Sequence, residues 1–143
     1  MSRPSDEMKE WLQKAKNDLL SARILIDHDP PVFDTASFHC QQAVEKVLKA
    51  FLIWNVVPFE KVHSLNYLLD LCETVEPRLA SVRKGAETLA PYAVEIRYPG
   101  ERVEVSPEEA QNALATAGTI WDFVLNLLPY ELSSFSHLEE DSE

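Results

Sequence analysis

The segment Phe38-His-Cys-Gln-Gln-Ala-Val-Glu-Lys-Val-Leu-Lys-Ala50 decides the fold, because it lies in a long helical stretch with apolar side chains on more than one face. Helical periodicity runs from about Phe33 to Asn55. One face carries the apolar residues Ala36, Cys40, Val44, Val47, Phe51 and Trp54. The opposite face carries Phe38, Gln42, Glu45 and Lys49, flanked by Gln41, Lys46, Leu52 and Ile53. Such a mixed face is typical of a helix that contacts something on both sides.

Two interpretations of this mixed face remain open at the level of sequence. In the first, Glu45 and Lys49 form a surface pair at four-residue spacing, beside an isolated phenylalanine. In the second, the face is a polar pocket or the contact surface for a partner. The second interpretation places Phe38 and Leu52 at the interface of a homodimer, where a symmetric contact repeats the same patch on both copies.

Nine prolines and three glycines punctuate the chain, and the prolines fall where helices should stop. The stretches between them predict helices over about 5–27 and 33–55, a third after the N-cap Ser64, and a fourth from Pro77. The last helix begins at the capping box Ser106-Pro107-Glu108-Glu109 and is stopped by Pro129. We therefore predict an all-α protein, an antiparallel up-and-down bundle of four to five helices in residues 1–128.

Residues 129–143 differ in composition from the predicted bundle. They hold five acidic residues and no lysine or arginine, which is typical of a solvated appendage. Four apolar side chains in this tail offer a means of weak docking on the bundle: Tyr130, Leu132, Phe135 and Leu138.

Composition excludes several classes of protein. The 143 residues are 45% apolar and 26% charged, as expected for one globular domain. The net charge of −11 argues against a protein that coats nucleic acid, which needs a dense basic face. No apolar leader follows Met1, and the longest apolar run, Ala50 to Trp54, is too short to cross a membrane. These features predict a cytoplasmic protein with no membrane contact.

The sequence offers no local pattern for metal or covalent chemistry. Cys40 and Cys72 are too few for a disulfide framework and lack the spacing of metal ligands. No glycine-rich phosphate loop is present, and no nucleophile has a nearby base in sequence. We therefore predict no metal, no cofactor and no catalytic residue.

The segment from Phe38 to Ala50 resembles the second-helix signature of HEPN domains. The likeness extends from about Asp6 to Leu128. The first helix of that family is resembled by the residues Trp11, Ala15, Asp18, Leu19 and Ala22. The segment His63-Ser64-Leu65 resembles the start of its third helix, and Arg97-Tyr98-Pro99 with the capped helix at Ser106 resembles its C-terminal half. The resemblance implies a helical bundle that usually forms a homodimer. Members include metal-independent ribonucleases, often toxins paired with MNT-type nucleotidyltransferases, and others are described as nucleotide-binding domains.

The resemblance also implies what an active ribonuclease of this family carries: an arginine followed by a histidine after four to six residues. Counting from Arg97, those positions hold Arg102, Val103 and Glu104. Arg23 and His28 have the spacing but lie on the first predicted helix, in the wrong context. We therefore expect ribonuclease activity of this kind to be absent, unless His39 or His63 takes the place of the missing histidine.

The candidate ligand-binding residues are Gln42, Lys46, Lys49 and Arg97, which would line a polar cleft for a nucleotide or an RNA end. Asp18, Glu45 and His63 are expected to support them, and either carboxylate could instead pair with Arg97 in a purely structural role. His39 and His63 are each expected to make one structural hydrogen bond. The alternative functions are a non-catalytic component paired with a nucleotidyltransferase and, ranked last, an active ribonuclease.

Overall fold

The computed structural model describes residues 4–94 and 104–129, and within these ranges every regular element is a helix. The α-helices are α1 (Pro4–Asp27), α2 (Phe33–Trp54), α3 (Leu65–Val75), α4 (Ala80–Glu87) and α5 (Pro107–Leu125). Short 3-10 turns, η1 (Pro77–Leu79) and η2 (Ala90–Tyr92), precede and follow α4. The prediction of an all-α bundle is confirmed. Within the described ranges, no helix is long and apolar enough to cross a membrane.

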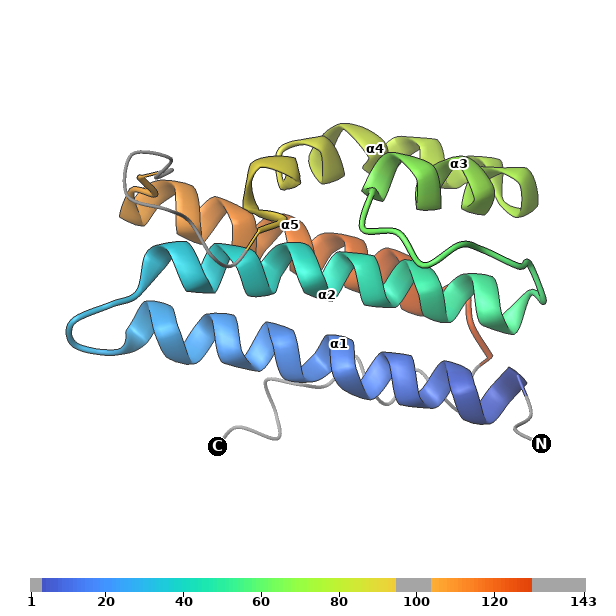
Figure 1. Ribbon diagram of the computed structural model, residues 1–143, viewed down its shortest axis with the longest axis horizontal. Coiled ribbons are helices and arrows are strands. Elements are labelled where there is room, and N and C mark those ends of the chain that lie inside the picture. Colours follow the sequence, from blue (N-terminus) through green and yellow to red (C-terminus); the bar gives the residue numbers. More distant parts are fainter. Residues whose placement is uncertain (1–3, 95–103, 130–143) are drawn as a thin grey trace.

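The bundle is built around α2, which packs against α1, α5 and α3 (Figure 1). Helices α1 and α2 run antiparallel, and α5 runs in the direction of α2 and contacts both. Successive helices alternate in direction except between α2 and α3. Residues 55–64 run back along the bundle, so that α3 points the same way as α2 (Figure 1). This return carries the residues just before α3 to the middle of α2.

The C-terminus of α2 ends in a Schellman motif. The backbone N–H of Val57 donates to the carbonyl of Leu52, and that of Val56 donates to the carbonyl of Ile53. Val56 adopts the left-handed conformation with φ 57°, where a β-branched side chain is strained, and 74% of its surface is exposed. The sequence Trp54-Asn55-Val56-Val57 therefore stops the helix without the glycine that usually occupies this position.

Burial on α1 follows one stripe, whereas burial on α2 extends almost all round the helix. The second apolar face of α2 is covered by helices of the same chain, which explains its composition without a partner. Leu52 is fully buried in this core. The expectation that Leu52 contributes to a dimer interface is therefore corrected, because its side chain is not accessible to a second copy. Phe38 is half-buried and stays a candidate.

Two predicted helix starts are confirmed in atomic detail. The Ser64 hydroxyl accepts a hydrogen bond from the backbone N–H of Tyr67 at 3.2 Å. At α5 the Ser106 hydroxyl accepts from the Glu109 backbone N–H, and the Glu109 carboxylate accepts from that of Ser106, which is the reciprocal capping box. Both caps depend on residues three apart in sequence, which is why they could be predicted locally.

Candidate functional site

The candidate site lies on the face of α2 that meets α1 and the returning segment 55–64. His39, Gln42 and Lys46 are spaced three and four residues apart, so their side chains emerge from one face of the helix. Glu45, directly before Lys46, and Lys49, one turn after Glu45, lie beside them. This face carries the polar residues singled out in the sequence, together with His39.

Asp18 anchors the part of this face that is nearest to α1. Its side chain is 9% exposed, and its two oxygens lie 2.7 Å from His39 Nδ1 and 2.6 Å from Lys46 Nζ. The buried carboxylate is thus compensated by a cation and by a ring nitrogen, as burial of a charge requires. The predictions of a structural acceptor at Asp18 and a structural hydrogen bond at His39 agree with this geometry.

Glu45 anchors the second part of the face and is almost completely buried, with a side chain 2% exposed. Its Oε1 atom lies 2.9 Å from Lys49 Nζ and 2.8 Å from His63 Nδ1. The amide of Gln42 donates to the other oxygen at 3.3 Å and to the side chain of Gln41 at 2.7 Å. Glu45 therefore ties the segment before α3 to the middle of α2.

Lys49 is an internal cation rather than a surface residue. Its side chain is 9% exposed, and its Nζ atom lies 5.2 Å from the ring centroid of Trp11 on α1. A cation at this distance over an indole is attracted by the ring electrons. The interpretation of Glu45 and Lys49 as an exposed surface pair is therefore wrong, because both groups lie inside the bundle.

What the face presents to solvent is a row of nitrogen-bearing side chains, which we call the polar strip: His39, Gln42, Lys46 and His63. The side chains of His39 and Lys46 are each 24% exposed, and that of His63 is 75% exposed. Their carboxylate partners lie beneath them. Because Nδ1 of His63 bonds to Glu45, its Nε2 atom is the ring nitrogen left for other partners.

The structure brings together most of the predicted site residues. Gln42, Lys46 and His63 lie in the polar strip, and Asp18 and Glu45 form hydrogen bonds with its members. Lys49 takes part in the same hydrogen-bond network but is buried behind the strip. Arg97 lies outside the described residues, as do Arg102, Val103 and the tail from Tyr130 onward. Phe38 is next to His39, with the two rings 5.6 Å apart in an edge-on arrangement.

The sequence analysis predicts only a structural hydrogen bond for His39 and does not include it among the ligand-binding residues. Its spacing of three and seven residues from Gln42 and Lys46 is the signal that it shares their face of the helix. The bond between His63 and Glu45 had no such signal, because the two residues are 18 positions apart and meet only through the return of the chain.

Elsewhere the described residues offer little chemistry. Two adjoining hollows of about 250 and 310 Å³ lie between the α4–η2 segment and α5, lined largely by small and hydroxyl-bearing residues such as Ser81, Thr116 and Thr119. Within the described part of the chain, no cluster of histidine, cysteine and acidic residues is suited to a metal ion. Burial raises the pKa of both Cys40 and Cys72 to about 12, so neither thiol is a reactive nucleophile near neutral pH.

Comparison with known proteins identifies the class to which this bundle belongs. Residues 8–127 match the model of the HEPN domain, and the chain belongs to this family. A curated relative, named "Putative toxin MJ1304", from Methanocaldococcus jannaschii, is 26% identical over 136 residues that span 84% of this chain and 87% of the relative. The resemblance found in the second-helix segment is thereby confirmed.

Two solved structures share the fold. The crystal structure of TT1696 from Thermus thermophilus superposes with a TM-score of 0.69 at 25% identity, covering 85% of this chain and 98% of that one. The crystal structure of ST0689, an archaeal HEPN homologue, has a TM-score of 0.65 at 20% identity, covering 89% of this chain and 98% of that one. The second likeness, at this level of identity, establishes the fold alone.

Proposed function

We propose that the protein is a cytoplasmic homodimeric HEPN module that binds a nucleotide or an RNA end at the polar strip, with Arg97 as a further contact. One observation supports this most directly: the strip presents the side chains of Lys46, His39 and His63 to solvent while its two carboxylates lie beneath them, 9% and 2% exposed. In a chain of net charge −11, an anion would find donors here without facing the acids directly.

Charge balance on this face supports the same conclusion. Asp18 and Glu45 contribute two negative charges, and Lys46 and Lys49 contribute two positive charges, so the face is neutral before either histidine is protonated. A phosphate would approach the partly exposed Lys46 ammonium and the Nε2–H of His63 in its protonated form, whereas both N–H groups of the Gln42 amide are already donated to Gln41 and Glu45. Hydrogen bonds to a charged group contribute about 1.5–3 kcal/mol each, which is enough for weak but specific binding.

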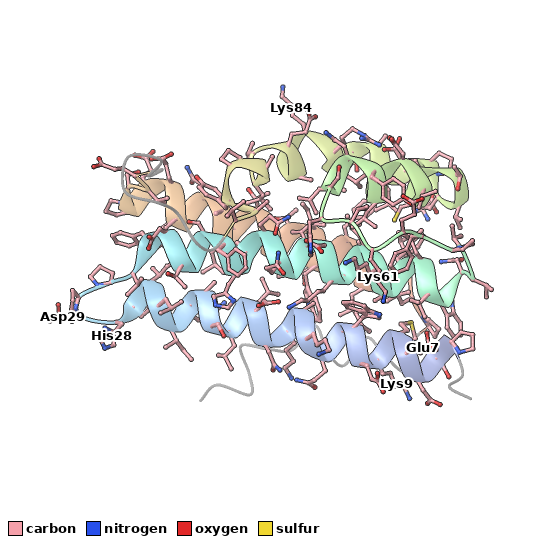
Figure 2. The ribbon with its side chains drawn as sticks, viewed as in Figure 1. Glu7, Lys9, His28, Asp29, Lys61 and Lys84 are labelled. Carbon is pink, nitrogen blue, oxygen red and sulfur yellow. The ribbon has the colours of Figure 1, made fainter. Side chains whose placement is uncertain are left out.

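The binding test uses fluorescence anisotropy of a labelled single-stranded RNA and of a labelled ATP analogue. His63→Ala is expected to weaken binding about tenfold, the equivalent of one lost contact to a charged group. His28→Ala is the matched control, because His28 is also exposed and also uses Nδ1 locally, with its bond to the Pro30 carbonyl at 2.8 Å. Figure 2 places His28 at the connection between α1 and α2, at one end of the bundle. Equal effects of the two substitutions would contradict the proposal.

We expect binding without metal-independent cleavage, since the histidine that the family's ribonucleases use after the arginine is missing after Arg97. General acid–base help from such an imidazole is worth about 10²–10⁴-fold in rate, so its absence should be obvious. Incubation of metal-free protein with mixed single-stranded RNA tests this. Cleavage that disappears in His63→Ala would overturn the expectation and make His63 the substitute.

The homodimer is tested separately from ligand binding. Light scattering at tens of micromolar should show two copies, and Phe38→Glu should shift the distribution toward one, because a buried like-charge pair would form across a symmetric contact. Asp34→Glu, an exposed change one turn earlier on α2, is the control. A monomer in the unchanged protein would contradict the dimer but leave the binding assay informative.

A second candidate function is an interaction component without chemistry of its own, paired with an MNT-type nucleotidyltransferase. The acidic excess and the relative named as a toxin favour it. Co-expression with an MNT-type nucleotidyltransferase, followed by gel filtration, provides the test. A stable complex, together with no binding of RNA or ATP analogue by the chain alone, would favour this function over the first.

A further inference from the structure

The outer face of α1 carries the feature that neither the core nor the polar strip explains. Leu20 and Ile24 are 46% and 56% exposed, although the helix buries its other leucines and isoleucines wholly or partly. They lie one helical turn apart, so they form a continuous apolar surface. Lys16 and Arg23 flank them on the same side of the helix. We call these four residues the α1 patch.

We propose that the α1 patch is the docking surface for the chain's own C-terminal segment, residues 130–143. The patch combines two apolar side chains with two basic ones. The segment has the complementary composition, with the apolar residues Tyr130, Leu132, Phe135 and Leu138, five acids and no lysine or arginine. Burial of apolar surface would provide the attraction, and the opposite charges would orient the segment on the patch.

The position at which the described chain ends allows residues 130–143 to reach the α1 patch. Helix α5 ends at Leu125, and its C-terminal end lies at the same end of the bundle as the start of α1 (Figure 1). Leu20 is 16 residues beyond Pro4, which at 1.5 Å per residue is about 24 Å along α1. Extended chain spans about 3.3–3.6 Å per residue, so Leu138, nine residues beyond Pro129, can lie up to about 30–32 Å from the end of the described chain and can therefore reach Leu20.

Tethering favours the chain's own segment over a segment from another molecule. A short flexible linker holds its end at an effective concentration in the millimolar range, about a thousandfold above a protein solution at 1 µM. Weak contacts, which would not hold a free peptide, are therefore sufficient in the intact chain. A second copy of the chain remains a distinct outcome that the experiment can detect.

Disulfide trapping in the full-length protein tests the proposal. Leu20→Cys combined with Leu138→Cys should form a cross-link within one chain under mild oxidation at about 1 µM protein. Lys84→Cys with Leu138→Cys is the control, because Lys84 projects from α4 on the side of the bundle away from α1 (Figure 2). The native Cys40 and Cys72 do not compete, since both are buried and have a pKa of about 12.

The expected result is a cross-link within one chain in the Leu20 variant and little in the Lys84 variant. Equal yields in the two variants would overturn the proposal. Cross-links mainly between chains, detected by mixing two copies of different mass, would assign the patch to a second copy and would equally overturn it.

A second measurement covers the case in which the double-cysteine chain is distorted. The single variant Leu20→Cys should react with iodoacetamide several-fold more slowly than Lys84→Cys, because the docked segment covers it. Adding Phe135→Ser and Leu138→Ser, or raising the salt concentration, should speed the reaction of Cys at position 20 and leave that at position 84 unchanged. A rate at position 20 that ignores both changes would contradict docking.

Discussion

Two clusters of charged side chains in this protein pair carboxylates with cations at different degrees of burial. Asp18 and Glu45 lie between α1 and α2 with side chains 9% and 2% exposed, each compensated by a lysine and a histidine. On α3 and α4, Arg83 binds Asp70 at 2.8 Å and Glu73 at 2.9 Å; the Asp70 side chain is 72% exposed, and those of Arg83 and Glu73 are each 27% exposed. The bond lengths are alike, yet the energetic consequences of breaking them should not be.

The difference lies in what water can do after one partner is removed. An exposed carboxylate that loses its arginine is solvated at once, so exposed ion pairs contribute about 0–1 kcal/mol. A carboxylate inside the bundle has no such replacement, and removing one partner of a buried pair costs about 3–5 kcal/mol. The α1–α2 cluster is therefore the part of the molecule where single substitutions should matter most.

The largest effect is expected for Lys49→Met, which leaves the buried Glu45 carboxylate without its cation. The free energy of unfolding should fall by about 3–5 kcal/mol, measured from the midpoint of urea denaturation at unchanged slope. The matched change Arg83→Met should cost less, about 1 kcal/mol, because Asp70 and Glu73 are 72% and 27% exposed and water can solvate both carboxylates. Adding Glu45→Gln to Lys49→Met should recover part of the loss, because it removes the unpaired charge. Equal losses for Lys49→Met and Arg83→Met would contradict the claim that burial decides the cost of breaking these ion pairs.

A smaller effect is expected for Asp18→Asn, because its partner Lys46 is 24% exposed and can turn toward water. The loss of two charge-assisted hydrogen bonds should lower the free energy of unfolding by about 2 kcal/mol. Asp70→Asn changes the same atoms at a site 72% exposed, and should stay within about 0.5 kcal/mol. Reversal of this order in urea denaturation would show that burial is not the deciding variable.

The cysteines give a third measurement that reports on Asp18. Burial, and then the charge of Asp18, raise the pKa of Cys40 from 9.0 to about 12, and burial chiefly does the same for Cys72. Between pH 9 and 12 the thiols ionise in the unfolded chain but not in the folded one. Stability should therefore fall as the pH rises through this range, by about 1.4 kcal/mol per pH unit for each cysteine.

The control for this pH dependence is Cys72→Ala, which should halve the slope. Asp18→Asn should reduce the contribution of Cys40 and leave that of Cys72 unchanged, since Asp18 acts only on the pKa of Cys40. A stability that is flat from pH 9 to 10.5 would contradict the burial of both thiols.

The smallest predicted effect comes from a substitution at Val56, which changes no charge and therefore serves as a reference for the substitutions that do. Val56 occupies the left-handed position after α2, a conformation that costs a residue with a side chain about 1–2 kcal/mol. Val56→Gly should raise the free energy of unfolding by about 1 kcal/mol. Val57→Gly, one residue later and partly buried against the core, should lower it. If Val56→Gly destabilised the protein, its exposed side chain would have to make contacts that stabilise the fold.

Some features of the fold followed from neighbours in the sequence. The capping box at Ser106 and Glu109 and the cap at Ser64 involve residues three positions apart, so their geometry is settled as soon as the helix forms. The same holds for the placement of Gln42 and Lys46 on one helix face. The signature in the second helix also sufficed to predict the family that the comparison confirmed.

Other features could not be predicted, because they depend on which helices cover α2. Leu52 and Lys49 look available on a helical projection, yet both side chains are buried inside the bundle. A projection describes one helix in isolation, and it cannot show which of its faces the neighbouring helices will cover.

The sequence by itself determined the helices, their caps and the order of polar residues along α2, because these depend on local spacing and backbone chemistry. Only the tertiary structure decided that His63 meets Glu45, that Lys49 lies over Trp11, and that Asp18 and Glu45 lie beneath the side chains of the polar strip. The reason is physical: these contacts join residues brought together by the return of segment 55–64 and by the packing of α1, and no spacing rule operates across such separations.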